Sequence, residues 1–158
     1  MIQLERLQLG DIVRYTGMGR KDVLCRITQV HICTTLWRGE VSASAEMVGT
    51  EDVELSGSAC NFSPEPITNG FLRANGFLRE DALLFDEAVG DTDWWVKVYP
   101  CDGAPIRIGY DPKNCHFRAG NRANGNCWMS VGVHSVDEFQ RCLRFCLRYD
   151  KNLEVVVE

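Results

Sequence analysis

Short segments in which polar and apolar residues alternate, separated by turn-forming residues, run through most of this sequence. Residues 11–16 alternate as a strand does, and the glycine-rich residues 17–20 predict a turn. Residues 23–35 are rich in Val, Ile, Thr and Cys and predict a long strand with a bend near Gln29. Further strands are predicted at residues 36–45 and 52–55. This pattern restricts the N-terminal part of the chain to a small antiparallel sheet.

A stretch rich in serine and proline, residues 56–66, follows and is typical of a linker. A short helix is predicted after it at residues 68–75, with Thr68 as its N-cap and Gly76 just beyond its end. Strands then return, separated by Gly, Pro, Asn and Asp, and indicate an antiparallel meander. These strands are predicted at residues 82–85, 93–99, 106–110, 115–118 and 127–133.

The strongest helix prediction covers residues 136–149. Ser135 and Glu138 have the spacing of a capping box, in which each side chain accepts a hydrogen bond from the other residue's backbone N–H. The apolar face carries Phe139, Cys142, Leu143 and Cys146. We expect this face to lie across the meander, and a last strand is predicted at residues 153–157.

Together these elements predict an α+β fold. Residues 1–58 are expected to form a small antiparallel SH3-like barrel or curled sheet, because residues 9–13 resemble the opening strand of such barrels. Residues 64–158 are expected to form an antiparallel β-meander packed by one or two helices. The length of 158 residues fits two such small domains, and it also fits one continuous domain.

Three short motifs occur in order along the chain. They are Leu7-Gln8-Leu9-Gly10-Asp11-Ile12-Val13, then Pro64-Glu65-Pro66-Ile67-Thr68-Asn69-Gly70-Phe71-Leu72-Arg73-Ala74-Asn75-Gly76-Phe77, then Val133-His134-Ser135-Val136 with Gln140 and Leu143. Together they resemble a family of small uncharacterised proteins from Bacteroides-type bacteria, their phages and mobile elements. The middle motif is the most specific, and in the last one an insertion separates the His from the Gln. The family has no established activity, so the resemblance implies an origin in a phage or mobile element and carries over no site.

Charge and composition narrow the partners and the compartment. The net charge of −5 disfavours general nucleic-acid binding, which needs many cations against phosphates. No apolar stretch reaches the roughly 20 residues that cross a bilayer, and the first ten residues lack the parts of a signal peptide. We therefore expect a cytoplasmic protein that has no membrane contact. Its eight cysteines are expected to be reduced and mostly buried, because the cytosol keeps thiols reduced.

Residue types that bind zinc lie on neighbouring predicted strands, but their spacing argues against a site. They are Cys101, Cys115, His116, Cys127 and His134. Structural zinc sites usually carry ligands in closely spaced pairs, and the one such pair, Cys142 and Cys146, lies on the predicted core stripe of a helix. We predict no metal and no cofactor.

Catalysis has equally little support. Adjacent Cys115 and His116 point to opposite faces of a strand, whereas His31 and Cys33 share a face. A Cys–His pair needs contact and a lowered thiol pKa, and the sequence shows neither. We expect a protein that is not an enzyme.

Two features suggest a surface that binds a partner. Alternation puts Trp94 on one face of its strand and Trp95 with Tyr99 on the other, so Trp95 or Tyr99 is expected to lie outside. Arg141, Arg144 and Arg148 lie on the helix face opposite the apolar one, where they would meet an acidic partner or phosphates, or simply be solvated. The leading hypothesis is a non-enzymatic accessory protein of a phage or mobile element that binds another protein. The alternatives are a nucleic-acid or nucleotide binder that uses the SH3-like region and the arginine face, and a small Cys–His enzyme.

Overall fold

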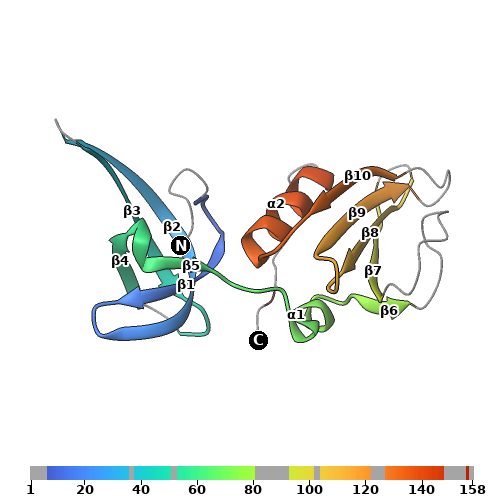
Figure 1. Cartoon of the computed structure of the whole chain (residues 1–158), viewed down its shortest axis with the longest axis horizontal. Helices are drawn as coiled ribbons and strands as arrows, with labels where there is room; N and C mark the ends of the chain where they lie inside the picture. The colour runs from blue at the N-terminus through green and yellow to red at the C-terminus, as the bar shows by residue number, and fades with distance from the viewer. Residues whose placement is uncertain are drawn as a thin grey trace. The chain divides into compact units, whose positions relative to one another are not determined.

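The structure is a computed structural model, shown in Figure 1, and it describes a large part of the chain. The described residues are 7–35, 38–50, 53–80, 93–101, 104–121, 127–147 and 156. The chain divides into two compact units, Met1–Pro66 and Ile67–Glu158. Both units are antiparallel sheets, and the second also contains two α-helices, so the fold is α+β as predicted. In the described ranges, no helix is both long enough and apolar enough to cross a membrane.

The first unit is a five-stranded antiparallel sheet with the strand order β4-β3-β2-β1-β5. The strands are β1 (Ile12–Gly17), β2 (Arg20–Thr35), β3 (Arg38–Met47), β4 (Glu54–Ser58) and β5 (Phe62–Pro64). The Tyr15 hydroxyl on β1 donates a hydrogen bond to the Ser56 carbonyl on β4 at 3.0 Å. Because β2 and β3 lie between β1 and β4 in the strand order, this bond shows that the sheet curls. It stays open between β4 and β5, and so matches the curled sheet of the two predicted forms.

The first hairpin and the bend in β2 agree with the sequence. Met18 and Gly19, with φ of 49° and 77°, form the turn between β1 and β2. The pairing of β2 with β3 shifts register between Ile27 and Gln29, where the sequence predicted a bend. Such a bulge increases the local twist of a strand.

Residues 56–66 do not form the predicted linker. The strand β4 continues to Ser58, a 3₁₀ turn covers Ala59–Asn61, and β5 pairs with β1. The physical reason is that Ala59 and Phe62, set among serines and prolines, are both fully buried. Proline is tolerated here because β5 is an edge strand.

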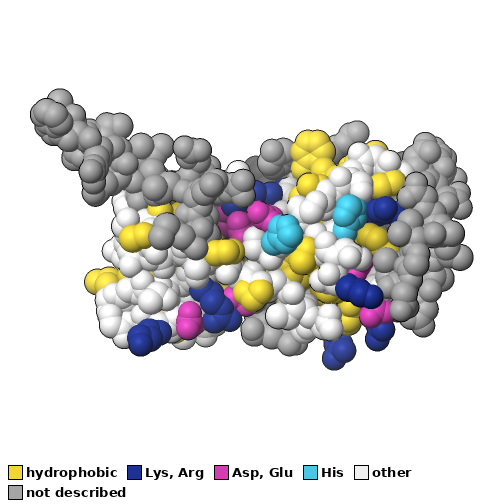
Figure 2. Space-filling model, in the orientation of Figure 1, with side chains coloured by type: hydrophobic (Ala, Val, Ile, Leu, Met, Phe, Trp, Pro, Cys, Tyr) yellow, Lys and Arg dark blue, Asp and Glu magenta, His cyan; other side chains and the backbone are white. Residues whose placement is uncertain are grey.

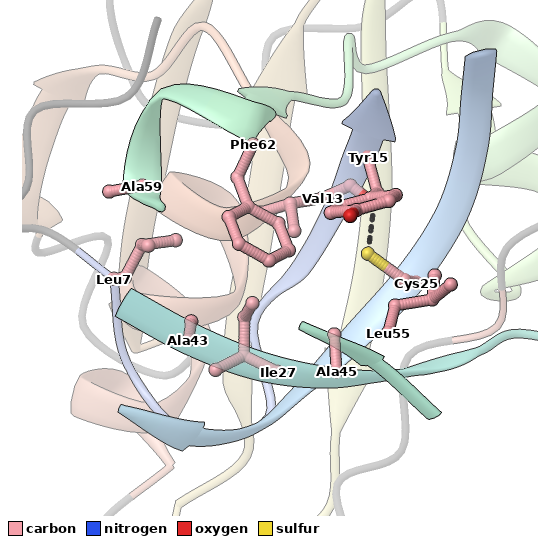
Figure 3. Packing of buried hydrophobic residues seen from close by; sticks show 10 residues of the cluster. All are labelled: Leu7, Val13, Tyr15, Cys25, Ile27, Ala43, Ala45, Leu55, Ala59 and Phe62. Carbon is pink, nitrogen blue, oxygen red and sulfur yellow. Dashed lines mark hydrogen bonds between the residues drawn. The ribbon is translucent and has the colours of Figure 1, made fainter. Parts of the chain in front are cut away.

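Figure 3 shows the core of the first unit, to which strands and the 3₁₀ turn all contribute. The rings of Tyr15 and Phe62 lie 5.2 Å apart, and the Cys25 thiol donates to the Val13 carbonyl at 3.4 Å. The ten residues drawn are Leu7, Val13, Tyr15, Cys25, Ile27, Ala43, Ala45, Leu55, Ala59 and Phe62.

The second unit is a five-stranded antiparallel meander with the strand order β10-β9-β8-β7-β6. The strands are β6 (Leu78–Glu80), β7 (Trp94–Tyr99), β8 (Ile106–Asp111), β9 (His116–Asn121) and β10 (Cys127–Gly132). The strands β7 to β10 confirm the predicted meander, and β6 is a strand that the sequence did not predict. The strands predicted at residues 82–85 and 153–157 lie outside the described residues, apart from Val156.

The short helix α1 (Asn69–Ala74) has both predicted caps. The Thr68 hydroxyl accepts a hydrogen bond from the Phe71 N–H at 3.0 Å. Gly76, with φ of 74°, is the left-handed residue after the helix, and the next N–H, of Phe77, bonds the Leu72 carbonyl at 3.0 Å. This is a Schellman motif, which satisfies carbonyls that the helix end leaves free.

The long helix α2 (Val136–Cys146) begins where predicted, but the capping box is wrong. The Ser135 side chain makes no capping hydrogen bond, and the Glu138 carboxylate accepts instead from the His134 N–H at 2.8 Å. The Glu138 carboxylate thus accepts from the backbone N–H of His134 and not from that of Ser135, as the capping box predicted. Residues 148 and 149 of the predicted helix lie outside the described part of the chain.

Candidate interaction surface

The tryptophans of β7 lie on opposite faces of the second sheet, and α2 covers the face that carries Trp95. Trp95 pairs with Tyr110, which in turn pairs with Phe117, so the three side chains share one face. The ring of Phe139, on α2, meets the rings of Tyr110 and Phe117 edge-on, with ring centres 5.5 Å and 5.4 Å apart. Trp95 is only 6% exposed, and its predicted exposure is therefore wrong.

Tyr99 shares the face of Trp95 and is not a free anchor either. It is half-buried, and burial raises its pKa to about 12. The Lys97 ammonium lies 4.7 Å from the centre of the Tyr99 ring and donates to the Asn75 carbonyl at 2.7 Å. Burial also lowers the pKa of Lys97. A role of Trp95 and Tyr99 in binding stays a prediction, although Trp95 is buried and Tyr99 is half-buried.

The arginine face of α2 is only partly as predicted. Arg141 donates to the Asp137 carboxylate, four residues earlier, at 3.0 Å, and the Asp137 side chain is nearly buried. Arg144 is half-buried in the last turn, and Arg148 lies outside the described residues. Because Arg141 is held by its own helix, it is poorly placed to meet a partner. Binding through this face stays a prediction.

On the opposite face of the sheet, Trp94 forms a cluster with residues of β9 and β10. The Arg118 guanidinium lies 5.3 Å from the centre of the Trp94 ring, and the His116 ring meets Trp94 edge-on at 6.2 Å. The His116 Nε2 lies 2.7 Å from the Ser130 hydroxyl oxygen. We call Trp94, His116, Arg118 and Ser130 the Trp94 cluster. Trp94, His116 and Arg118 are half-buried and remain partly open to solvent.

The sequence builds this cluster by alternation and by one glycine. In β9, His116 and Arg118 alternate with Phe117 and Ala119, which are fully buried. The strand β8 separates β9 from β7, and there Gly109 pairs directly with Arg118. Because Gly109 has no side chain, the long arginine can extend across β8 to the Trp94 ring.

Apolar and cationic side chains extend the surface around the Trp94 cluster. Leu78, which is 69% exposed, pairs with Val96 and therefore shares the face of Trp94. Val98, also exposed, follows on the same face and pairs with Arg107.

The carboxylate of Asp111 is buried and accepts two hydrogen bonds within its own turn, from the Lys113 N–H and the Asn114 side-chain amide.

Figure 2 shows how Lys and Arg side chains are distributed on one face of the molecule. There the dark-blue side chains are dispersed among white and yellow ones rather than gathered into one basic area. A protein that binds nucleic acid without sequence preference needs several phosphate contacts together. Within each unit, the described side chains in view form no continuous basic area of that kind.

The described cysteines are free thiols, but fewer are buried than predicted. Cys25 and Cys146 are buried, Cys115 and Cys142 are half-buried, and three are exposed: Cys60, Cys101 and Cys127. Burial raises the pKa of Cys25 and Cys146 to about 12 and that of Cys142 to about 11. Cys60 lies in the 3₁₀ turn, Cys101 follows the end of β7, and Cys127 begins the edge strand β10, positions that residue type alone does not reveal.

The predicted candidates for chemistry are not brought together in the described ranges. No group there of three or more His, Cys, Asp or Glu side chains could hold a metal ion. The Cys115 thiol points to the Pro112 carbonyl at 3.8 Å, while His116 belongs to the Trp94 cluster. The side chain of Cys33, the predicted neighbour of His31, lies outside what the structure describes.

Comparison of the chain with protein-family models, curated proteins and solved structures finds no match.

Proposed function

We propose that this chain is a non-enzymatic accessory protein that binds another protein through the Trp94 cluster. The observation that carries the proposal is the Arg118–Trp94–His116 arrangement on the sheet face opposite α2. Tryptophan and arginine are the residue types that most often dominate the energy of protein interfaces. Their mutual contacts hold them in place before a partner arrives, and that order reduces the entropy lost on binding.

The chemistry around the cluster indicates the kind of partner. Leu78 and Val98 offer apolar area beside the cluster, while Arg107 and Arg118 supply positive charge. A complementary segment would carry apolar side chains next to Asp or Glu. An origin in a phage or mobile element rests on the three motifs alone and stays a prediction.

Nucleic-acid binding is the second candidate, favoured by the pairing of Trp94 with a guanidinium on an open sheet. Proteins that bind single strands stack bases on aromatic rings. Here the guanidinium of Arg118 already lies over the Trp94 ring, so a base would have to displace it. The net charge of −5 further opposes a polyanion. An SH3-like fold of the first unit would support this candidate, and that fold stays a prediction.

Affinity capture followed by measurement with the purified partner tests the proposal. The immobilised chain is exposed to lysate, and a protein retained by the wild type is identified, purified and titrated by calorimetry. Arg118→Glu should weaken its binding about tenfold or more, because a hot-spot cation becomes an anion. The matched control is Phe145→Ser on α2, a residue 64% exposed, which should bind as the wild type does.

Equal affinity of the wild type and Arg118→Glu would refute the proposed surface. A shift of single-stranded DNA or RNA on a gel at physiological salt, with strong salt dependence and loss in Arg118→Glu, would favour the second candidate instead.

A further inference from the structure

Edge strands expose unpaired backbone N–H and C=O groups, and proteins usually protect them with charges, proline or short length. Three of the four edges of the described sheets follow this rule. The strand β4 contains Glu54, β5 has three residues and ends at Pro64, and β6 has three residues that include Arg79 and Glu80.

The fourth edge, the outer side of β10, has none of these protections. Its six residues, Cys-Trp-Met-Ser-Val-Gly, include no charge and no proline. All but Met129 are exposed, with Trp128 at 46% and Val131 at 39%. Among described strands only β9 pairs with β10, on its inner side. An exposed, uncharged and partly apolar edge of this length is suited to pairing with another strand.

We propose that β10 pairs with β10 of a second copy of this chain, antiparallel and about a two-fold axis, so that two five-stranded sheets become one. The strand is complementary to itself in the register centred on Ser130. In that register Met129 lies opposite Val131 of the second copy, an apolar pair, and the two Ser130 residues face each other.

A bulge between Cys127 and Met129 takes Trp128 out of the regular ladder, so residues 129–132 are the regular part of the edge. The register centred on Ser130 lies within this part.

Charge at this edge does not oppose a second copy. Each chain carries a net charge of −5, so two copies repel over most of their surfaces. The edge of β10 places no like charges opposite each other, and apolar burial with backbone hydrogen bonds can act there unopposed. A two-fold contact of this kind closes at the dimer, because the outer edge of β10 is then covered in both copies.

Sedimentation velocity on the full chain, from about 1 to about 100 µM, tests the dimer. The wild type should approach twice the 17.9 kDa of one chain as concentration rises. Ser130→Lys and Ser130→Glu should each dimerise about tenfold more weakly, because like charges then face each other across the axis. An equimolar mixture of the two variants should restore the dimer, which also shows that both variants are folded.

The control is Leu78→Lys, which adds a charge to the other edge of the same sheet and should leave the dimer intact. A wild type that stays monomeric at 100 µM would overturn the proposal. So would a dimer that both Ser130 variants form as strongly as the wild type.

Discussion

Gly76 shows how a single residue sets the end of an element. Its φ of 74° lies in the left-handed region, which a side chain disfavours, and it ends α1 so that the chain turns into β6. Its neighbours leave space for a methyl group, since the nearest atom to an added Cβ is the Lys97 Nζ at 3.6 Å. The cost of substitution there is one of conformation rather than of crowding.

We therefore expect Gly76→Ala to lower the free energy of unfolding by about 1–2 kcal/mol, the cost of a left-handed L-residue. Urea unfolding followed by circular dichroism measures the change. The control is Gly132→Ala, where φ is not left-handed and the nearest atoms to the new Cβ lie at 3.7 and 4.0 Å. If both variants lose the same stability, the conformation of Gly76 is not what matters.

Burial divides the thiols into two reactivity classes. Cys60, Cys101 and Cys127 are exposed, whereas Cys25 and Cys146 are buried and have a pKa raised to about 12. Since the thiolate is the reactive form, native protein at pH 8 should be alkylated at the exposed group well before the buried pair. Peptide mass spectrometry after timed iodoacetamide treatment reads out the order. Early labelling of Cys25 would show that the first unit opens readily.

The same thiols make stability fall at alkaline pH. The ordinary thiol pKa is 9.0, and burial raises it to about 12 for Cys25 and Cys146. These two thiols ionise at a lower pH in the unfolded chain than in the folded one. Their contribution to the free energy of unfolding is therefore complete below pH 9 and is lost as the pH rises from 9 to 12. Denaturant midpoints from pH 8 to 11 should decrease. Cys25→Ser keeps a small hydroxyl that does not ionise in this range, so its decrease should be shallower.

At the scale of elements, β8 lies between β9 and β7, and the Arg118 side chain extends across it to the Trp94 ring. Gly109→Val would put a branched side chain between Val96 and Arg118, its two paired neighbours. The Arg118 guanidinium should then leave the Trp94 ring. In NMR spectra the Arg118 side-chain signals should lose the ring-current shift that a nearby indole produces.

Gly132→Val is the control, because it adds the same side chain beside His116 on the edge strand rather than between Val96 and Arg118. Its Arg118 signals should stay as in the wild type. Unchanged Arg118 signals in Gly109→Val would mean that the missing side chain at position 109 is not what allows the contact.

At the scale of the whole molecule, each of the two units has its own aromatic core. Phe139 on α2 is fully buried and contacts four rings at 5.4–5.7 Å, those of Phe71, Phe77, Tyr110 and Phe117. Phe62 has the corresponding place in the first unit, beside Tyr15. Each core is built from residues of one unit.

Phe139→Ala should therefore destabilise residues 69–146 by about 3–5 kcal/mol and leave residues 12–64 nearly unchanged. Phe62→Ala should do the reverse. Hydrogen exchange measured by mass spectrometry on the full chain resolves the two regions. Faster exchange in both regions after either substitution would show that the units unfold together.

The sequence by itself determined most of the strands, where β2 bends and how α1 is capped. These features depend on neighbours within a few positions, such as Thr68 with Phe71, so local patterns contain the information. Alternation also placed Trp94 and Trp95 on opposite faces correctly, because side chains in a strand alternate.

Only the tertiary structure decided which of those faces is covered, and with it the candidate surface. Phe139 on α2 meets Tyr110 and Phe117, so Trp95 is buried and Trp94 is left for Arg118. Likewise, Phe62 makes residues 62–64 a strand because it fills the core of the first unit, despite a composition typical of a linker. Both outcomes follow from apolar burial between segments far apart in the chain, and the period of a strand indicates which side chains share a face without indicating what will cover it.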